Sequence, residues 1–190
     1  MKTDTKSGLN RRKVRMVAVN MIYAVMVNQS DTNEYWINTT QYAKTQEGQA
    51  QNKENEDDYY LDYLEKIIQS GKDSENYVLL HSLYHETLKN KEEIIKLISD
   101  FLENWDWDRI NKIEQVLMIL CITEWLYFPE IPVKVSLNEY MEIAKTYANP
   151  DESHKFINGI LDKILVYLQD NKKIHKIGKG NFIDTKNKKL

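Results

Sequence analysis

Apolar residues recur at helical spacing along most of the chain. Between Arg11 and Asn28, one stripe follows the i, i+3, i+4, i+7 pattern of a buried helix face: Val14, Val17, Ala18, Met21, Ile22 and Val25. A second stripe lies roughly opposite at 3.6 residues per turn, and it consists of Met16, Val19, Tyr23 and Met26. A helix that is apolar on two faces is either sandwiched in a core or offers one face to a partner, and the pattern leaves both interpretations open.

Further apolar stripes predict helices in the middle of the chain. One stripe starts near Tyr60 and ends at Gly71, and others cover residues 76–88, 94–102 and 110–125. The last of these contains seven consecutive apolar residues from Val116 to Ile122. A buried strand is the alternative for so short a run, but the length of the flanking pattern favours a central buried helix.

Two helices are expected after this central one. Pro129 and Pro132 predict a loop, and Ser136 followed by Glu139 fits a capping box that opens a helix through about residue 148. Pro150 is expected to end that helix.

The final core helix is expected to be capped by Ser153. Apolar spacing then continues from Phe156 to Leu165, straight through Gly159. We therefore interpret Gly159 as a close contact between helices rather than as a turn.

Polar segments set the expected domain organisation. Residues 29–58 are rich in Gln, Asn, Glu and Thr and predict a long polar insertion with one short helix around residues 36–42. Residues 1–10 predict a flexible basic start, and residues 169–190 predict a frayed, lysine-rich tail. The helical domain is thus expected to cover residues 11–168.

Composition agrees with an all-α fold class. The 190 residues include only 6 glycines and 3 prolines, which leaves few of the turns that an architecture of short strands requires.

The single cysteine excludes an internal disulfide and a cysteine-cluster zinc site. No apolar run approaches the ~18–20 residues of a membrane-spanning helix, and the first residues contain no hydrophobic signal core, so a cytoplasmic protein is expected.

Charge is distributed unevenly along the sequence. The net charge is -3, yet residues 1–15 carry six basic side chains against Asp4, and residues 172–190 carry seven lysines against Asp184. Two basic ends on an acidic body indicate a localised contact with a polyanion, although a lysine-rich tail can also simply favour solubility. Three of the four arginines lie within five residues, at Arg11, Arg12 and Arg15, and arginine is suited to bidentate phosphate contacts.

The sequence offers no arrangement typical of an enzyme. Asp151, Ser153 and His154 are triad residue types, but they lie too close in sequence to form a nucleophile–base–orienter geometry. His81 and His85 are spaced i, i+4 but lack the HExxH pattern of a zinc site. The sequence also lacks a glycine-rich loop of the kind that binds phosphate groups. We therefore expect no catalytic residues, no metal and no cofactor.

Three motifs stand out in the C-terminal half. The first is Trp105-Asp106-Trp107-Asp108-Arg109-Ile110 followed by Ile113-Glu114, and the second is Ile131-Pro132-Val133-Lys134-Val135 followed by Asn138-Glu139. The third and most specific is Ser153-His154-Lys155-Phe156-Ile157-Asn158-Gly159-Ile160-Leu161-Asp162. Together with Arg11-Arg12-Lys13-Val14-Arg15, these motifs resemble the NusB family of transcription antitermination factors over residues 11–28 and 105–168.

The resemblance implies a non-catalytic, RNA-binding all-α domain of two packed helical bundles. Such proteins bind the boxA element of ribosomal RNA leaders, as unpaired RNA, together with a small-subunit ribosomal protein called NusE, and act in the transcription elongation complex. The resemblance implies these RNA-binding residues: Arg11, Arg12, Lys13, Arg15, Ser153, Lys155 and Phe156. It places Tyr23 and Glu114 at the interface with the ribosomal protein. Physically, cations position an RNA backbone and an aromatic ring can stack on an unpaired base.

Several alternatives remain open beside this interpretation. Ile119 stands where the family commonly has an arginine. A divergent NusB-like interaction module is therefore the alternative function: it would bind protein partners or dimerise without boxA recognition. For Phe156 and Tyr23, packing inside the protein is the alternative to a binding role, and Glu114 could pair with a helical neighbour instead.

Overall fold

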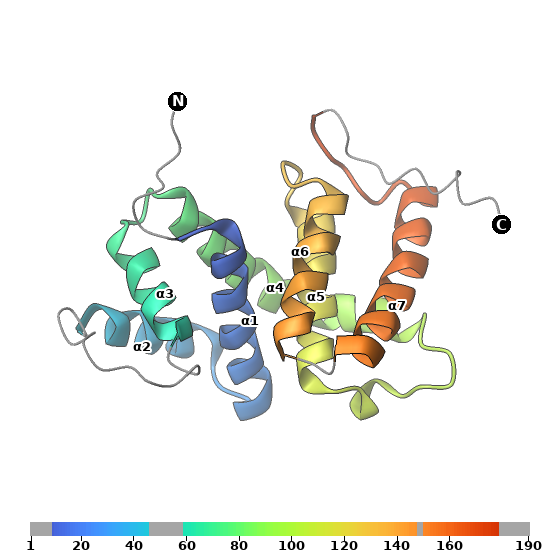
Figure 1. Ribbon diagram of the computed structural model, residues 1–190, viewed down its shortest axis with the longest axis horizontal. Helices are drawn as coiled ribbons and strands as arrows, with labels where there is room; N and C mark the ends of the chain where they lie inside the picture. The colour runs from blue at the N-terminus through green and yellow to red at the C-terminus, as the bar shows by residue number, and fades with distance from the viewer. Residues whose placement is uncertain (1–8, 46–58, 148–149, 179–190) are drawn as a thin grey trace. The chain divides into compact units, whose positions relative to one another are not determined.

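The computed structural model describes residues 9–45, 59–147 and 150–178, and within these ranges it contains seven α-helices, one 3-10 turn and no strand. The helices are α1 (Arg11–Asn28), α2 (Thr32–Thr45), α3 (Tyr59–Gln69), α4 (Glu75–Ser99), α5 (Lys112–Tyr127), α6 (Val133–Tyr147) and α7 (Pro150–Asp170), with the 3-10 turn η2 at Trp107–Arg109 (Figure 1). The predicted all-α fold class is confirmed. The chain divides into two compact units, one up to Leu88 and one from Lys89, and α4 runs through the boundary.

Helix α1 begins and ends where the apolar pattern predicts. The side chain of Asn10 caps it by accepting a hydrogen bond from the backbone N–H of Lys13 at 3.0 Å. Gln29 ends the helix in a left-handed conformation, with φ of 51°. The first apolar stripe is buried throughout, whereas in the second stripe Val19 is buried and Tyr23 is 40% exposed. The second face of α1 is therefore covered only in part.

Helix α2 is longer than the short helix expected at residues 36–42, because it covers Thr32–Thr45. Its Trp36 is buried, with its ring centroid 5.0 Å from that of Tyr84 and 5.2 Å from that of His81. The Tyr84 hydroxyl also donates a hydrogen bond to the Thr32 carbonyl at 2.7 Å. Trp36 thus packs α2 against α4, and Ala43 of α2 is buried as well. The rest of the expected insertion, residues 46–58, lies outside the described residues, as do residues 1–8 of the expected flexible start.

Helix α3 and the part of α4 up to Leu88 complete the first unit. As predicted, α3 is followed by Gly71, which has φ of +89° and donates its backbone N–H to the Ile68 carbonyl at 3.3 Å. Helix α3 contacts both α1 and α2. The two apolar stripes expected at residues 76–88 and 94–102 mostly belong to one continuous helix, the 25-residue α4.

Helix α5 is the buried centre of the second unit, as the sequence predicts. Every residue from Gln115 to Trp125 is buried, including Cys121, and α6 and α7 run beside this helix (Figure 1). The carboxyl group of Glu124 accepts hydrogen bonds from the Ser136 hydroxyl at 2.7 Å and from the Tyr140 hydroxyl at 2.8 Å. All three side chains are fully buried, so this polar cluster joins α5 to α6 inside the core.

The predicted capping box at Ser136 is wrong. Helix α6 already begins at Val133, directly after Pro132, and Ser136 therefore lies inside its first turn. Its hydroxyl is used by Glu124 of α5 instead of by the end of its own helix. The carbonyl of Pro132 accepts from the backbone N–H groups of Val135 and Ser136, so the helix has already begun where the capping signal stands.

Of three predictions around α7, one is confirmed and two are wrong. Helix α6 ends at Tyr147, before Pro150, as expected. Pro150 also begins α7, because proline fits the first helical position, so Ser153 lies within the first turn and is not the cap. Gly159 is exposed, and among the described residues no atom outside its own helix backbone lies within 4 Å of the place a Cβ would take. It is therefore not a close contact between helices.

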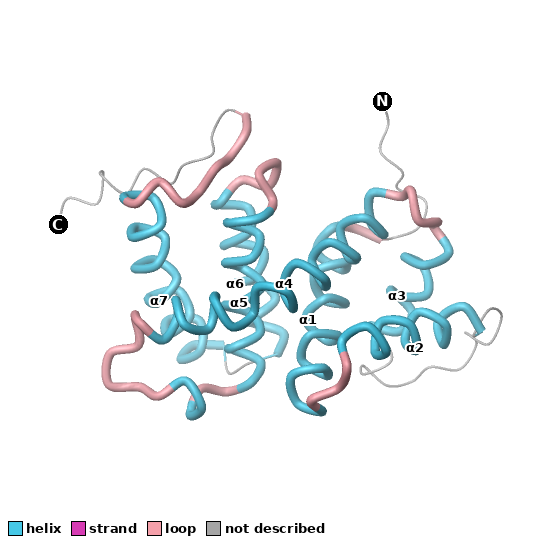
Figure 2. The backbone as a smooth tube through the Cα atoms, turned by 180° about the vertical axis from the view of Figure 1, so that it is seen from behind, coloured by secondary structure: helices cyan, strands magenta, loops and turns pink. Residues whose placement is uncertain are grey.

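The segment after α7 folds back, which corrects the expectation of a frayed tail for residues 171–178. Lys172 turns the chain with φ of 52°, and Ile174 is buried. The backbone N–H of Ile177 donates to the carbonyl of Pro129 at 3.0 Å, so the segment returns to the α5–α6 loop (Figures 1 and 2). Residues 179–190 lie outside the described residues.

Lys176 fastens this returning segment to the end of α5. Its Nζ donates to the carbonyl oxygens of Glu124 at 2.8 Å and Phe128 at 2.6 Å. Burial of the ammonium group lowers the pKa of Lys176 to about 8. A neutral amine still has two N–H donors, which is the number these two carbonyls require.

Candidate nucleic-acid interface

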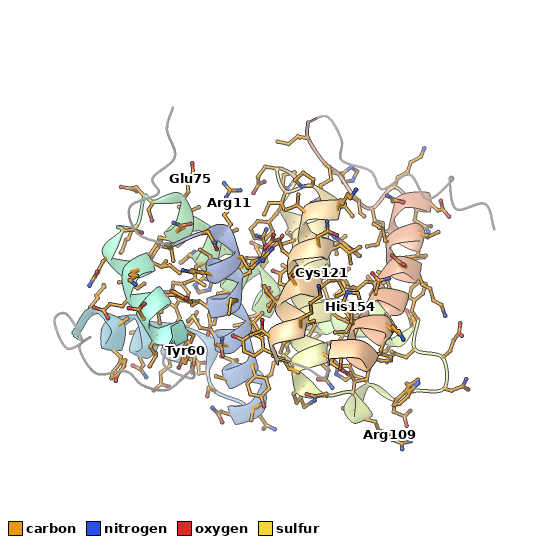
Figure 3. The ribbon with its side chains drawn as sticks, in the orientation of Figure 1. Arg11, Tyr60, Glu75, Arg109, Cys121 and His154 are labelled. Carbon is orange, nitrogen blue, oxygen red and sulfur yellow. The ribbon has the colours of Figure 1, made fainter. Side chains whose placement is uncertain are left out.

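The first turn of α1 presents two exposed guanidinium groups. Arg11 and Arg12 are both exposed, and Arg11 pairs with Glu75 at 3.2 Å (Figure 3). The side chains of this pair are 57% and 86% exposed, so water screens the pair and its contribution to stability is small. The Arg11 guanidinium can therefore exchange Glu75 for an anion at little cost.

Lys13 and Arg15 have different surroundings from the two exposed arginines. The Nζ of Lys13 lies 4.5 Å from the centroid of the Tyr63 ring, a cation–π geometry. Arg15 is only 2% exposed, and its Nη1 lies 3.5 Å from the carbonyl oxygen of Arg11. The predicted cluster is thus divided into two exposed cations, one half-buried cation over a ring and one buried cation.

The start of α7 carries the other predicted RNA-binding residues. Ser153 is buried, Lys155 is exposed and Phe156 is half-buried. The Phe156 ring centroid lies 5.7 Å from that of Trp105 in the loop before α5, with 60° between the ring planes. Trp105 is 55% exposed. The sequence alone does not single out Trp105, because only its exposure in the fold separates it from the three other tryptophans.

The two residues expected at a protein interface lie in different units. Tyr23 is exposed on α1, four residues before Val27, which is 47% exposed. Residues four apart are neighbours on one helix face, so these two side chains form a small apolar patch. Glu114 is half-buried in the first turn of α5, where a carboxylate interacts favourably with the helix dipole.

The histidine pair is part of the packing around Trp36. The ring centroids of His81 and His85 lie 4.3 Å apart, and both rings contact Trp36. Among the described residues, no three His, Cys, Asp or Glu side chains are grouped so that they could hold a metal ion. In the same part of the chain, none of the helices combines the length and apolar character needed to cross a membrane.

Comparison with known proteins gives consistent matches. The model of the NusB family matches residues 39–166, a range that begins in α2. The transcription antitermination protein NusB of Salinibacter ruber is 43% identical over 98 residues, which are 52% of this chain and 61% of that protein. NusB of Chloroherpeton thalassium is 30% identical over 172 residues, which are 90% of this chain and 69% of that protein.

A solved structure of T. maritima NusB has the same fold, with a TM-score of 0.57 and 23% identity over 86% of this chain and 92% of that one. The predicted family resemblance is therefore confirmed by sequence and by fold: the chain belongs to the NusB family.

Proposed function

We propose that this protein is a transcription antitermination factor that binds boxA-type, unpaired RNA of ribosomal RNA leaders. It acts without catalysis, together with the small-subunit ribosomal protein NusE, in the transcription elongation complex. The observation that carries the proposal is the exposure of Arg11 and Arg12 on the first turn of α1. The first turn of α1 has no acidic residue, so this end of the helix is open to phosphate.

Each group has a defined role in this proposal. Arg11 and Arg12 bind phosphates of the RNA through their planar guanidinium groups, which fixes the position of the backbone. Lys155 supplies a further cation and Phe156 an aromatic ring at the start of α7. The apolar patch of Tyr23 and Val27 is the docking surface for the ribosomal protein.

The test is a titration of fluorescent boxA RNA, with and without NusE, over a series of salt concentrations. We expect the double variant Arg11→Ala/Arg12→Ala to bind more weakly and to flatten the salt dependence by about 0.7 per lost phosphate contact. Lys66→Ala/Lys145→Ala is the matched control, because it removes two exposed, ion-paired cations elsewhere. Unchanged affinity in the folded arginine variant, or an equal loss in the control, would contradict the proposal.

A second candidate function uses the same patch on α1. Tyr23 and Val27 are exposed neighbours, which also fits a module that binds protein partners or dimerises without boxA recognition. Retained NusE binding or a dimer in sedimentation, combined with no RNA affinity, would select this alternative. Loss of NusE binding in Tyr23→Ala, with RNA binding intact, would instead support the first proposal.

A further inference from the structure

An exposed tryptophan and a half-buried phenylalanine form an aromatic pair on the surface of the second unit. Trp105 precedes η2 and Phe156 lies in α7, and their ring centroids are 5.7 Å apart. Slightly more than half of the Trp105 surface is open to water. An exposed tryptophan next to a second ring offers a large flat apolar area at little cost in side-chain entropy.

The loop that carries Trp105 makes contacts on both sides of the tryptophan. Before it, Glu103 pairs with Lys163 of α7 at 2.9 Å, and Asn104 has a left-handed φ of 60°. After it, the buried Gln115 side chain donates from Nε2 to the carbonyls of Trp107 at 2.8 Å and Ile110 at 3.1 Å. The contacts of the buried Gln115 thus restrict the backbone that follows Trp105, and less conformational entropy is lost on binding.

Charges around the pair indicate which part of an RNA it accepts. Asp106, directly after Trp105 in the same loop, is exposed, and its carboxylate repels phosphate. Lys155 is exposed and directly precedes Phe156 on α7. A base is neutral and has an aromatic face, so it can lie on the rings while a neighbouring phosphate meets Lys155.

We propose that Trp105 and Phe156 together form a stacking platform for one unpaired base of the bound RNA. This inference rests on the proposed function and adds Trp105 to its site. Stacking releases no counterions, whereas phosphate contacts do. The platform therefore contributes affinity that does not depend on salt, in contrast to Arg11 and Arg12.

The experiment measures the affinity of boxA RNA for Trp105→Ala and Trp105→Phe over the same salt series. We expect Trp105→Ala to weaken binding by between about fivefold and about a hundredfold with an unchanged salt slope, the range for one stacked base. Trp105→Phe keeps an aromatic face and is expected to recover most of the lost affinity. Tyr42→Ala is the matched control, since Tyr42 is an aromatic residue on α2 with a similar exposure of 51%.

A crosslinking measurement on the unaltered protein keeps the inference testable if Trp105→Ala does not fold. Irradiation of boxA RNA carrying 5-iodouridine is expected to attach the RNA to the peptide of Trp105 or of Phe156. Crosslinks confined to other peptides would overturn the platform, as would Trp105→Ala binding within about twofold of the wild type or a changed salt slope. No RNA binding by the wild type would overturn the proposed function and the platform together.

Discussion

Removal of the Glu124 carboxyl group should be among the most destabilising single changes in the second unit. Its two oxygens accept hydrogen bonds from Ser136 at 2.7 Å and Tyr140 at 2.8 Å, and none of the three side chains is exposed. In Glu124→Ala, both hydroxyls lose this acceptor in a site that water does not reach. The cost of a buried polar group that loses its partner is about 1–3 kcal/mol, so the two hydroxyls together give about 4 kcal/mol.

This loss is large enough to measure by thermal and urea unfolding. For a chain of this size, about 4 kcal/mol corresponds to a fall in Tm of about 8–16 °C. Tyr140→Phe removes only one of the two donors and is expected to cost about 1–2 kcal/mol. The matched control is Glu142→Ala, which deletes an exposed glutamate from α6 and should stay within about 0.5 kcal/mol of the wild type.

A double-mutant cycle separates the hydrogen bond from the loss of packing. If the bond exists, Glu124→Ala/Tyr140→Phe should cost less than the sum of the two single changes by about 1 kcal/mol or more. Glu124→Ala within about 1 kcal/mol of the wild type, or strictly additive costs, would refute the argument.

Two further perturbations test other contacts. Trp36→Ala should destabilise the first unit by about 3–5 kcal/mol, because the buried Trp36 ring packs α2 against α4. It should also speed amide hydrogen exchange in α2, and unchanged exchange there would contradict this. Lys176 has a pKa of about 8 in the folded protein, below its usual value of 10.5, so the unfolded chain binds more protons between these pH values. The free energy of unfolding of the wild type, measured relative to Lys176→Met by urea titration, should therefore rise from pH 8 to pH 10.5, and a flat or falling difference would contradict the assignment.

Much of the fold could be predicted because burial leaves a periodic pattern in the sequence. Helix α1 has the predicted ends, and the seven apolar residues from Val116 to Ile122 mark the buried α5. Helix α2 was underestimated because its buried residues, Trp36, Thr40 and Ala43, include only one large apolar side chain, which is too few to produce an apolar stripe.

Helix starts were harder to predict because two local signals competed. Both Pro132 and Pro150 stand at helix starts, and in each case a serine three or four residues later also fits a cap. The returning segment after α7 depends on Ile174 and Lys176, whose partners are far away in the sequence. Local patterns cannot show such partners.

The candidate site could be predicted in chemical type but not in accessibility. A cluster of cations can be read from the sequence, whereas the burial of Arg15 depends on which face of α1 is covered. Trp105 illustrates the reverse case, since a large apolar residue that the fold leaves exposed looks like any core residue in the sequence. These differences come from tertiary packing, which decides the exposure of each residue.

The complete burial of Cys121 makes this protein suitable for site-specific labelling. It is the only thiol in the sequence, and it lies inside α5, out of reach of a maleimide in the folded state (Figure 3). Cysteines introduced at exposed positions, such as Tyr42→Cys in the first unit and Val166→Cys in the second, should therefore react alone, with no need to replace Cys121. A fluorophore pair at these positions would report the distance between the two units while RNA is added.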